Sequence, residues 1–172
     1  MIKDEWKGIG VVVVLVSLLA AAVVPFVMAQ PEAEIQCSVT TSSIAVSVDN
    51  PFIDYEVVGT GSSKSSDNIT ATNDGNVAEN FTIRGSDAVP QGGGTNWTLA
   101  STTDTDQYRH TFTGAPTPPP ETNLDTTPTL LASDVPATTG TKTFKLTLYT
   151  PTEITTTEAT FDTTVTIVAS EA

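Results

Sequence analysis

The chain has 172 residues, with 7 Lys or Arg against 20 Asp or Glu, so its net charge is −13. The charges within residues 1–29 cancel, which leaves this acidity on residues 30–172. The sign argues against nucleic acid as a partner, because phosphates need a basic surface, and against an anionic membrane surface. About 140 residues remain beyond the apolar start, which is the size of a single domain.

An uncharged apolar segment covers residues 8–28 and, at about 20 residues, is long enough to cross a bilayer as a helix. We expect one N-terminal hydrophobic helix over residues 1–29, serving as a signal peptide or membrane anchor, and an extracellular domain over residues 30–172. Two lysines precede the segment and two glutamates follow it, an order that keeps the N-terminus inside. The chain therefore meets the membrane through this helix, at least before processing.

Three processing routes remain open for the segment. A signal peptidase would cut after Ala29 and release Gln30 as the new N-terminus. An uncleaved anchor fits the length of the apolar segment. The third route is cleavage between Gly8 and Ile9, because the residues around Lys7 resemble the prepilin-peptidase site of archaeal type IV pilins.

Beyond the leader, apolar residues recur at every second position, the pattern of half-buried strands, and helical periodicity is absent. The predicted fold class is all-β, an antiparallel β-sandwich. Strands are expected at residues 35–39, 44–48, 52–58, 68–72, 77–84, 97–100, 108–112, 142–149 and 160–168.

Turn signals separate these strands. The Asn-Asp-Gly-Asn sequence at residues 73–76 predicts a hairpin. The three glycines at 92–94 predict a hairpin tip, since the Lys and the following helix of a phosphate loop are missing. Residues 114–129 are rich in proline and predict either a structured excursion or a mobile surface loop.

The hairpin region resembles a known group of proteins. Residues 68–77 and 80–83 resemble the T-x-T-N-x-G-N-V hairpins of Ig-like sandwich domains in prokaryotic surface proteins, and residues 94–99 and 107–112 look like the same group. With the apolar leader and a closing strand at 161–168, the layout is similar to TasA-type matrix fibres and archaeal bundling pili. The resemblance implies that each subunit lends an N-terminal strand to the next subunit's sheet, and it carries over no catalytic residue.

Residues suited to catalysis are scarce, and we do not expect an enzyme. His110 is the single histidine of the chain and is predicted to be an exposed strand residue. Cys37 is the single cysteine, so an intramolecular disulfide is excluded. It is expected to be a small buried apolar residue or, alternatively, to bridge two chains.

Carboxylates offer one candidate metal chemistry. Calcium takes several carboxylate and carbonyl oxygens, and the candidate ligands are Asp74, Asp87, Asp104, Asp106 and Asp134. None of them lies in a complete calcium-loop motif. The pair at 104 and 106 is also typical of solvated turn residues. No other cofactor is expected.

Three N-x-[ST] sequons are present, at Asn68, Asn80 and Asn96. They are glycosylation candidates in any organism that glycosylates its exported proteins, and they would mark exposed positions.

The main functional hypothesis is a non-enzymatic extracellular structural protein, a subunit of a surface filament or coat that self-associates by β-strand addition. Ile35, Cys37 and Val39 are the strand-donation candidates, because they alternate close to the exported N-terminus. One alternative is a membrane-tethered Ig-like binding or adhesion module that uses the Pro-rich loop and Trp97. Another is a type IV pilin-like subunit with residues 9–29 in a filament core.

Overall fold

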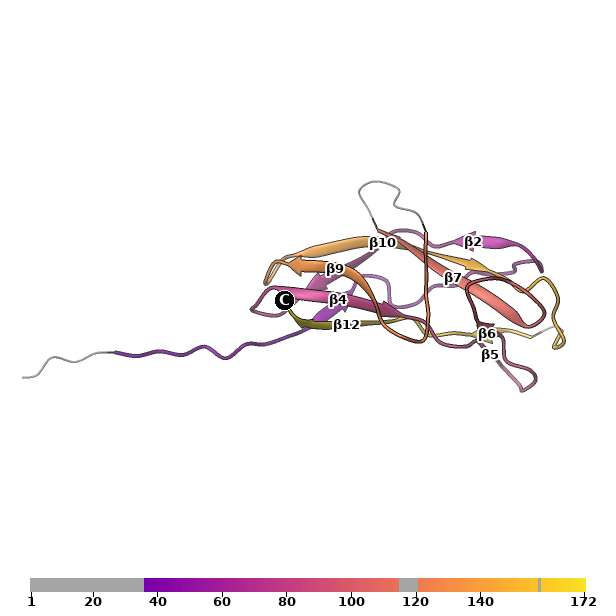
Figure 1. Cartoon of the computed structure of the whole chain (residues 1–172), viewed down its shortest axis with the longest axis horizontal. Coiled ribbons are helices and arrows are strands. Elements are labelled where there is room, and N and C mark those ends of the chain that lie inside the picture. Colours follow the sequence, from indigo (N-terminus) through magenta and orange to yellow (C-terminus); the bar gives the residue numbers. More distant parts are fainter. Residues whose placement is uncertain (1–35, 115–120, 158) are drawn as a thin grey trace, which may run out of the picture. The chain divides into compact units, whose positions relative to one another are not determined.

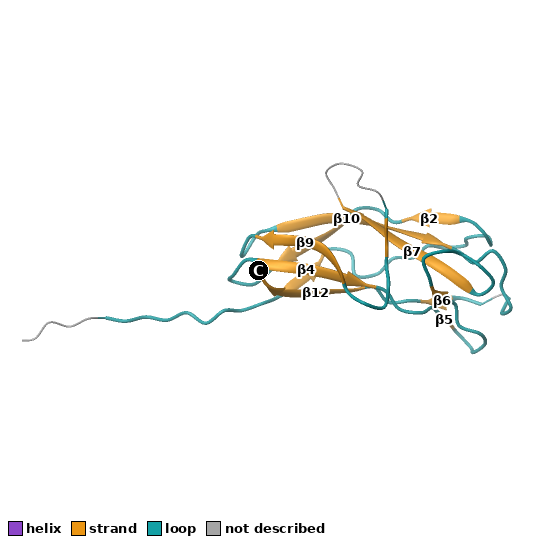
Figure 2. Cartoon of the chain, in the orientation of Figure 1, coloured by secondary structure: helices purple, strands orange, loops and turns teal. Residues whose placement is uncertain are grey.

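The computed structural model describes residues 36–114, 121–157 and 159–172, and over these ranges it contains strands and loops but no helix (Figure 2). The described chain is therefore all-β, as the period-two pattern predicts. The chain divides into two compact units, Met1–Val39 and Thr40–Ala172, and every described strand belongs to the second. The predicted N-terminal helix lies outside the described residues.

Twelve strands lie within the described ranges, and several are only two or three residues long. They are β1 (Val46–Val48), β2 (Ser63–Ser65), β3 (Ile69–Asn73), β4 (Glu79–Arg84), β5 (Val89–Pro90), β6 (Thr98–Leu99), β7 (Gln107–Gly114), β8 (Thr122–Asn123), β9 (Thr129–Val135), β10 (Thr141–Tyr149), β11 (Phe161–Asp162) and β12 (Thr166–Glu171).

These strands form two main sheets and one small one. In the seven-stranded sheet β1, β3, β10, β7 and β6 are neighbours in that order, while β2 also pairs with β10 and β8 with β7. The three-stranded sheet has the order β12-β4-β9, and β11 pairs with β5. Figure 1 shows β4 between β9 and β12, with β7 and β10 in the other layer. All pairs are antiparallel except β6 with β7.

One hydrophobic core joins the two main sheets. Alternate residues of neighbouring segments point into it: Ile69 and Ala71 of β3, with Phe81 and Ile83 of β4, are at most 3% exposed. Further members of this core are Phe112, Leu124, Leu131, Val135, Phe144 and Leu146. Because both sheets contribute a buried face to the same core, the arrangement is compatible with a β-sandwich.

The turn at residues 73–76 connects the two main sheets, so the prediction of a hairpin there is wrong. β3 pairs with β1 and β10, whereas β4 pairs with β12 and β9. Gly75 does not have a positive φ. A Cβ at this position would instead collide with the Glu79 carboxylate and the Ser43 carbonyl. Glycine is therefore required for close approach of other groups, not for a left-handed turn.

Side chains next to this turn hold the chain just before β1. Asn76 accepts the Ser43 N–H through Oδ1 at 2.7 Å and donates from Nδ2 to the Thr41 carbonyl at 2.9 Å. The buried Glu79 accepts the Ala45 N–H through Oε1 at 2.9 Å. The chain therefore enters β1 along a path fixed by hydrogen bonds.

The glycine run at 92–94 forms the predicted hairpin tip. Its three residues have φ values of 95°, 91° and 133°, which side chains rarely allow. The residues before and after the tip pair with each other, because Ala88 and Trp97 form an antiparallel bridge. This hairpin brings Trp97 back beside the sheet.

Residues 114–129 are partly structured. Their ends belong to β7 and β9, and β8 pairs with β7 in between. Leu124 is only 2% exposed, and its N–H donates to the His110 carbonyl at 2.8 Å. Where it is described, the Pro-rich stretch is thus an excursion fixed to the sheet, while residues 115–120 lie outside the described part.

Other strand boundaries also differ from the prediction. The strand expected at 44–48 is reduced to β1. The single strand expected at 160–168 is instead two strands in different sheets, β11, which pairs with β5, and β12, which pairs with β4 and continues to Glu171. The pattern gives no signal for β2, which reads Ser-Lys-Ser, or for the two-residue β5 and β8. β9 also escapes prediction, because register shifts in its pairing with β4 break the period of two.

Candidate functional site

Each main sheet ends in a strand with a single partner among the described residues. β1 pairs only with β3, and the six-residue β12 pairs only with β4. An end strand displays backbone N–H and C=O groups that another chain can use. The outer edge of β9 is less suited to pairing with another chain. Register shifts interrupt the pairing of β9 with β4, and Asp134 of β9 has a φ of 51°.

A cavity of about 840 Å³ is lined by both of these end strands. Val46 and Val48 of β1 and Ile167 of β12 contribute to its wall, and so do the core residues Ile69 and Leu146. We name it the edge cavity. Its volume is typical of ligand pockets. At this edge, part of the core is therefore not covered by a strand.

Residues 50–58 all line the edge cavity, and we name them the cover segment. No described strand includes them. The Tyr55 hydroxyl lies 3.0 Å from Nε2 of His110, and the Glu56 carboxylate lies 2.6 Å from Nζ of Lys64. Side-chain bonds therefore help to hold this segment where ladder bonds are missing.

The strand predicted at residues 52–58 is wrong for a local reason. Glu56 has a φ of 54°, which an extended strand does not contain. Ile53 packs against the core, but Phe52 and Val57 are 77% and 98% exposed. The apolar residues of the cover segment therefore do not share one buried face.

Five rings form a continuous series at this cavity, which we name the aromatic row. Phe161 stacks on Trp97 with ring centres 3.8 Å apart, and Tyr108 lies 6.4 Å from Trp97. His110 follows at 6.3 Å from Tyr108, and Tyr55 at 5.8 Å from His110. All of these except Tyr108 line the edge cavity. The cavity thus has an aromatic wall beside its aliphatic one.

Burial keeps the titratable members of the row uncharged near neutral pH. It lowers the pKa of His110 to about 4. It also raises the pKa of Tyr55 and brings that of Tyr108 to about 12, where the Thr163 hydrogen bond opposes the rise and the Asp87 charge adds to it. The edge cavity is therefore walled by neutral rings.

His110 is 1% exposed, so the prediction of an exposed strand residue is wrong. The sequence did contain the signal for its burial. Tyr108 and Phe112 lie two residues to either side in β7, and both are buried. Because alternate residues of a strand share a face, a histidine between two aromatic residues at this spacing belongs to the inner face.

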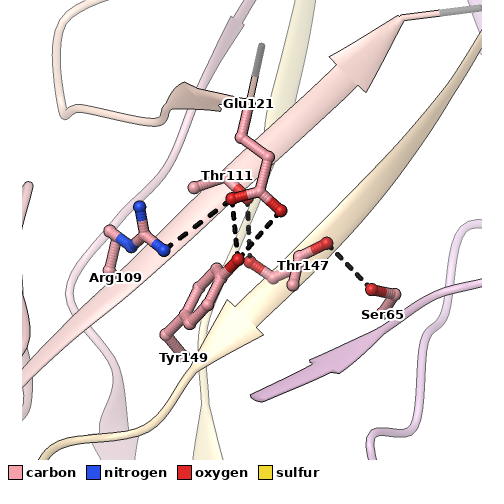
Figure 3. A network of polar contacts seen from close by, with 6 residues as sticks. All are labelled: Ser65, Arg109, Thr111, Glu121, Thr147 and Tyr149. Atoms are coloured by element: carbon pink, nitrogen blue, oxygen red, sulfur yellow. Dashed lines mark hydrogen bonds and ion pairs between the residues drawn. The ribbon is translucent and has the colours of Figure 1, made fainter. Parts of the chain in front are cut away.

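Arg109, Glu121 and Tyr149 form a polar cluster (Figure 3), and none of them lines the edge cavity. The Tyr149 hydroxyl donates to both oxygens of Glu121, at 2.8 and 2.7 Å, and this carboxylate raises the pKa of Tyr149. The Arg109 guanidinium lies 3.8 Å from the centre of the Tyr149 ring and 3.7 Å from Glu121. The cluster holds Glu121, which directly follows the undescribed residues 115–120, against β7 and β10.

The predicted strand-donation residues are only partly described. Ile35 lies outside the described residues, while Cys37 and Val39 are exposed and belong to no strand. The expectation of a buried Cys37 is wrong, because the thiol is free and exposed. In the single chain the described residues 36–39 therefore form no strand.

The three sequons differ in accessibility. Asn68, just before β3, and Asn96, just before Trp97, are exposed. Asn80 is half-buried in the central strand β4, and its Oδ1 accepts the Asp134 N–H at 3.1 Å. Asn68 and Asn96 are thus the more accessible glycosylation candidates.

The calcium candidates do not come together. The Asp106 carboxylate accepts hydrogen bonds from the N–H and the hydroxyl of Thr155, at 2.9 and 2.6 Å. Asp87 accepts the Leu99 N–H at 2.8 Å. The remaining candidates, Asp74, Asp104 and Asp134, are exposed. Across residues 36–172, apart from the undescribed gaps, no three His, Cys, Asp or Glu side chains are grouped so that they could hold a metal ion.

The apolar stretch at residues 8–28 lies outside the described residues. In the part of the chain that the structure does describe, no helix has the length and apolar character needed to span a membrane. Comparison with protein-family models, with curated proteins and with solved structures found no match to this chain.

Proposed function

We propose that this chain is a non-enzymatic extracellular structural protein, a subunit of a surface filament or coat whose copies join by β-strand addition. In this proposal the two main sheets form an Ig-like antiparallel sandwich. Residues 30–39, which we name the arm, leave one copy and add to the free edge of β12 in the next. The apolar leader carries the chain across the cytoplasmic membrane or anchors it there.

The observation that carries this proposal is the edge cavity. It is lined by the end strands of both main sheets and by core side chains that no strand covers at that edge. In an extended arm, Ile35, Cys37 and Val39 would share one face and fill this space. Full burial of Ile35 and of Val39 would contribute about 1.5–3 kcal/mol each. The backbone of β12 would supply ladder hydrogen bonds at the same time.

The length of the arm is also sufficient for pairing with β12. Six residues of β12 extend over about 20 Å, and the ten residues of the arm over about 33 Å when fully extended. The arm is therefore long enough to pair along all of β12 and to reach beyond its end. The described end of the arm, residues 36–39, is exposed and belongs to no strand, which leaves its backbone available to a neighbour.

Deletion of residues 30–39 tests the mechanism. The whole core and every described strand lie in Thr40–Ala172, so the shortened domain should fold. We expect wild-type mature protein to form filaments in negative-stain electron microscopy and the deletion variant to remain monomeric, with an unchanged circular dichroism spectrum.

A scrambled arm of the same composition provides the matched control. If the alternation of apolar side chains matters, the scrambled variant should assemble as poorly as the deletion. Filaments of normal abundance from the deletion variant would exclude strand addition by the arm.

A second function, a membrane-tethered binding or adhesion module, is favoured by the volume of the edge cavity, which suits a ligand of ordinary size. Mass spectrometry of the mature N-terminus separates the possibilities. Gln30 at the terminus supports a secreted subunit, Met1 supports a tethered module, and Ile9 supports the type IV pilin-like arrangement.

A further inference from the structure

The lining of the edge cavity carries negative charge. Asp54, Glu56 and Asp162 line the cavity, whereas no Lys or Arg is among the described residues that line it. Glu56 is paired with Lys64 at 2.6 Å, which offsets its charge. The carboxylates of Asp54 and Asp162 accept hydrogen bonds from neutral groups, the Glu56 N–H at 2.7 Å and the Gln91 side chain at 2.8 Å. Among the described residues, neither of these two carboxylates forms an ion pair.

Aromatic rings line the same cavity. Trp97 and Phe161 are stacked, Tyr55 lines the cavity with them, and Asp162 directly follows Phe161 in β11. Because burial lowers the pKa of His110 to about 4, this ring is neutral near pH 7 and adds no positive charge to the lining. The face of an aromatic ring attracts cations, and the face of Trp attracts them most strongly. The rings and the carboxylates therefore favour the same kind of ligand, a cation.

The rest of the lining indicates which kind of cation fits. A metal ion needs several oxygen ligands at short distance, whereas most of the residues that line this cavity are aliphatic or aromatic. Val46, Val48 and Ile167 form the aliphatic wall beside the rings. An ammonium group that carries apolar substituents can bury these substituents against such a wall. The volume of about 840 Å³ is sufficient for a ligand of this kind.

We propose that the aromatic wall of the edge cavity binds a small organic cation, namely an ammonium group that carries apolar substituents. The ammonium group lies against the rings of the wall, and Asp54 and Asp162 balance its charge. This binding activity goes beyond the proposed function and does not require assembly. Phe161 and Asp162 belong to β11, which pairs with β5, whereas the arm is proposed to pair along β12. The cation and the arm therefore use different strands of the cavity wall.

Tryptophan fluorescence can test the proposal, because Trp97 is the only tryptophan between residues 40 and 172. The domain over this range contains every described strand and lacks the arm. The probe is benzyl(2-hydroxyethyl)dimethylammonium chloride, titrated at constant ionic strength. Its matched comparison is 3,3-dimethyl-4-phenylbutan-1-ol, in which carbon replaces the charged nitrogen and the shape is kept. We expect a saturable change in Trp97 emission with the cation, and binding about tenfold weaker for the alcohol.

Substitution then measures the contribution of the carboxylate. Asp162→Asn removes one charge of the lining and keeps an oxygen that can accept the Gln91 hydrogen bond. Affinity for the cation should fall about three- to tenfold, because a nearby opposite charge is lost, while affinity for the alcohol should stay unchanged. Asp125→Asn is the matched control, since it removes the same charge from an exposed residue that does not line the cavity. Its affinity for the cation should equal that of the wild type.

Three results would overturn the proposal. The first is an unchanged Trp97 emission at saturating concentrations of the cation. The second is equal affinity for the cation and the alcohol, which would show that the cavity recognises apolar shape alone. The third is an equal loss of cation affinity in Asp162→Asn and Asp125→Asn, which would place the effect in the overall charge of the domain. Filament formation by the mature chain is measured separately, so either proposal can fail without the other.

Discussion

At the scale of single residues, His110 illustrates how burial sets chemistry. Its ring lies on the inner face of β7 between Tyr108 and Phe112, and it is 1% exposed. Removal from water penalises the charged form, which lowers the pKa to about 4. The imidazole therefore serves as a neutral hydrogen-bonding ring that keeps Tyr55 in place.

This burial predicts a pH dependence of stability. Above pH 6.5 the ring is neutral in both the folded and unfolded states and contributes no dependence. Between pH 6.5 and 4 the imidazole binds a proton in the unfolded chain but not in the folded chain. The free energy of unfolding therefore decreases as the pH decreases, by about 3 kcal/mol in all. Urea unfolding across this range should show the loss, and His110→Phe should remove that part of the slope. Equal slopes in the two proteins would contradict the burial of a neutral ring.

At the scale of elements, the turn at residues 73–76 decides the architecture. It takes the chain from β3 in one main sheet to β4 in the other. Asn73 closes it, since its Oδ1 accepts the Gly75 N–H and its Nδ2 donates to the carbonyls of Val77 and Val135. A buried amide with all three bonds satisfied specifies this crossing more tightly than apolar packing would.

Gly75→Ala should therefore destabilise the domain. The added methyl group meets the Glu79 carboxylate and the Ser43 carbonyl, and such overpacking costs about 1–3 kcal/mol. Gly59→Ala is the matched control, because its methyl group would lie 3.5 Å from Oγ of Ser62, an ordinary contact. Thermal unfolding should show a lower midpoint for the first variant and a change within about 0.5 kcal/mol for the second. Equal midpoints would show that the turn relaxes without cost.

At the scale of the whole molecule, the net charge of −13 opposes self-association. Copies that join through the arm must bring acidic surfaces together. At low ionic strength the repulsion acts over about 30 Å, and at physiological salt over about 8 Å. In the proposed fibre, apolar burial in the edge cavity would therefore compete with long-range repulsion.

Salt should therefore accelerate assembly. Raising NaCl from about 10 mM to about 150 mM should increase the initial rate of light scattering severalfold, because screening removes most of the repulsion. CaCl₂ at the same ionic strength is the comparison that isolates calcium binding. Equal rates in the two salts indicate screening alone, and a rate that does not respond to NaCl would refute the electrostatic argument.

The sequence predicts the strands better than it predicts their partners. Period two is clear in β3 and β4, where buried and half-buried residues alternate, and these two strands and β10 lie close to their predicted positions. The partners of β3 were missed because neighbouring strands in a chain usually pair. Here the chain crosses from one main sheet to the other at residues 73–76, where the Asn73 amide donates to the carbonyls of Val77 and of the distant Val135, and no local pattern predicts the second of these bonds.

The candidate site was less predictable than the fold. Trp97 was named from the sequence, whereas Tyr55 and His110 were not assigned to a site. Tyr55 reaches His110 from a segment with no regular backbone period, so only the three-dimensional structure brings them together. The edge cavity likewise depends on which strands end the sheets, and strand order is a property of the whole chain.

The bonds at the start of the domain have a mechanical consequence for a fibre joined through the arm. Tension would reach the domain just before β1, where the side chains of Asn76 and Glu79 accept hydrogen bonds from the backbone N–H groups of Ser43 and Ala45. Glu79 begins β4, the central strand of the three-stranded sheet. The load would therefore pass into a strand with two neighbours instead of peeling β1 away from its single partner, and the fibre would stretch without unravelling its subunits.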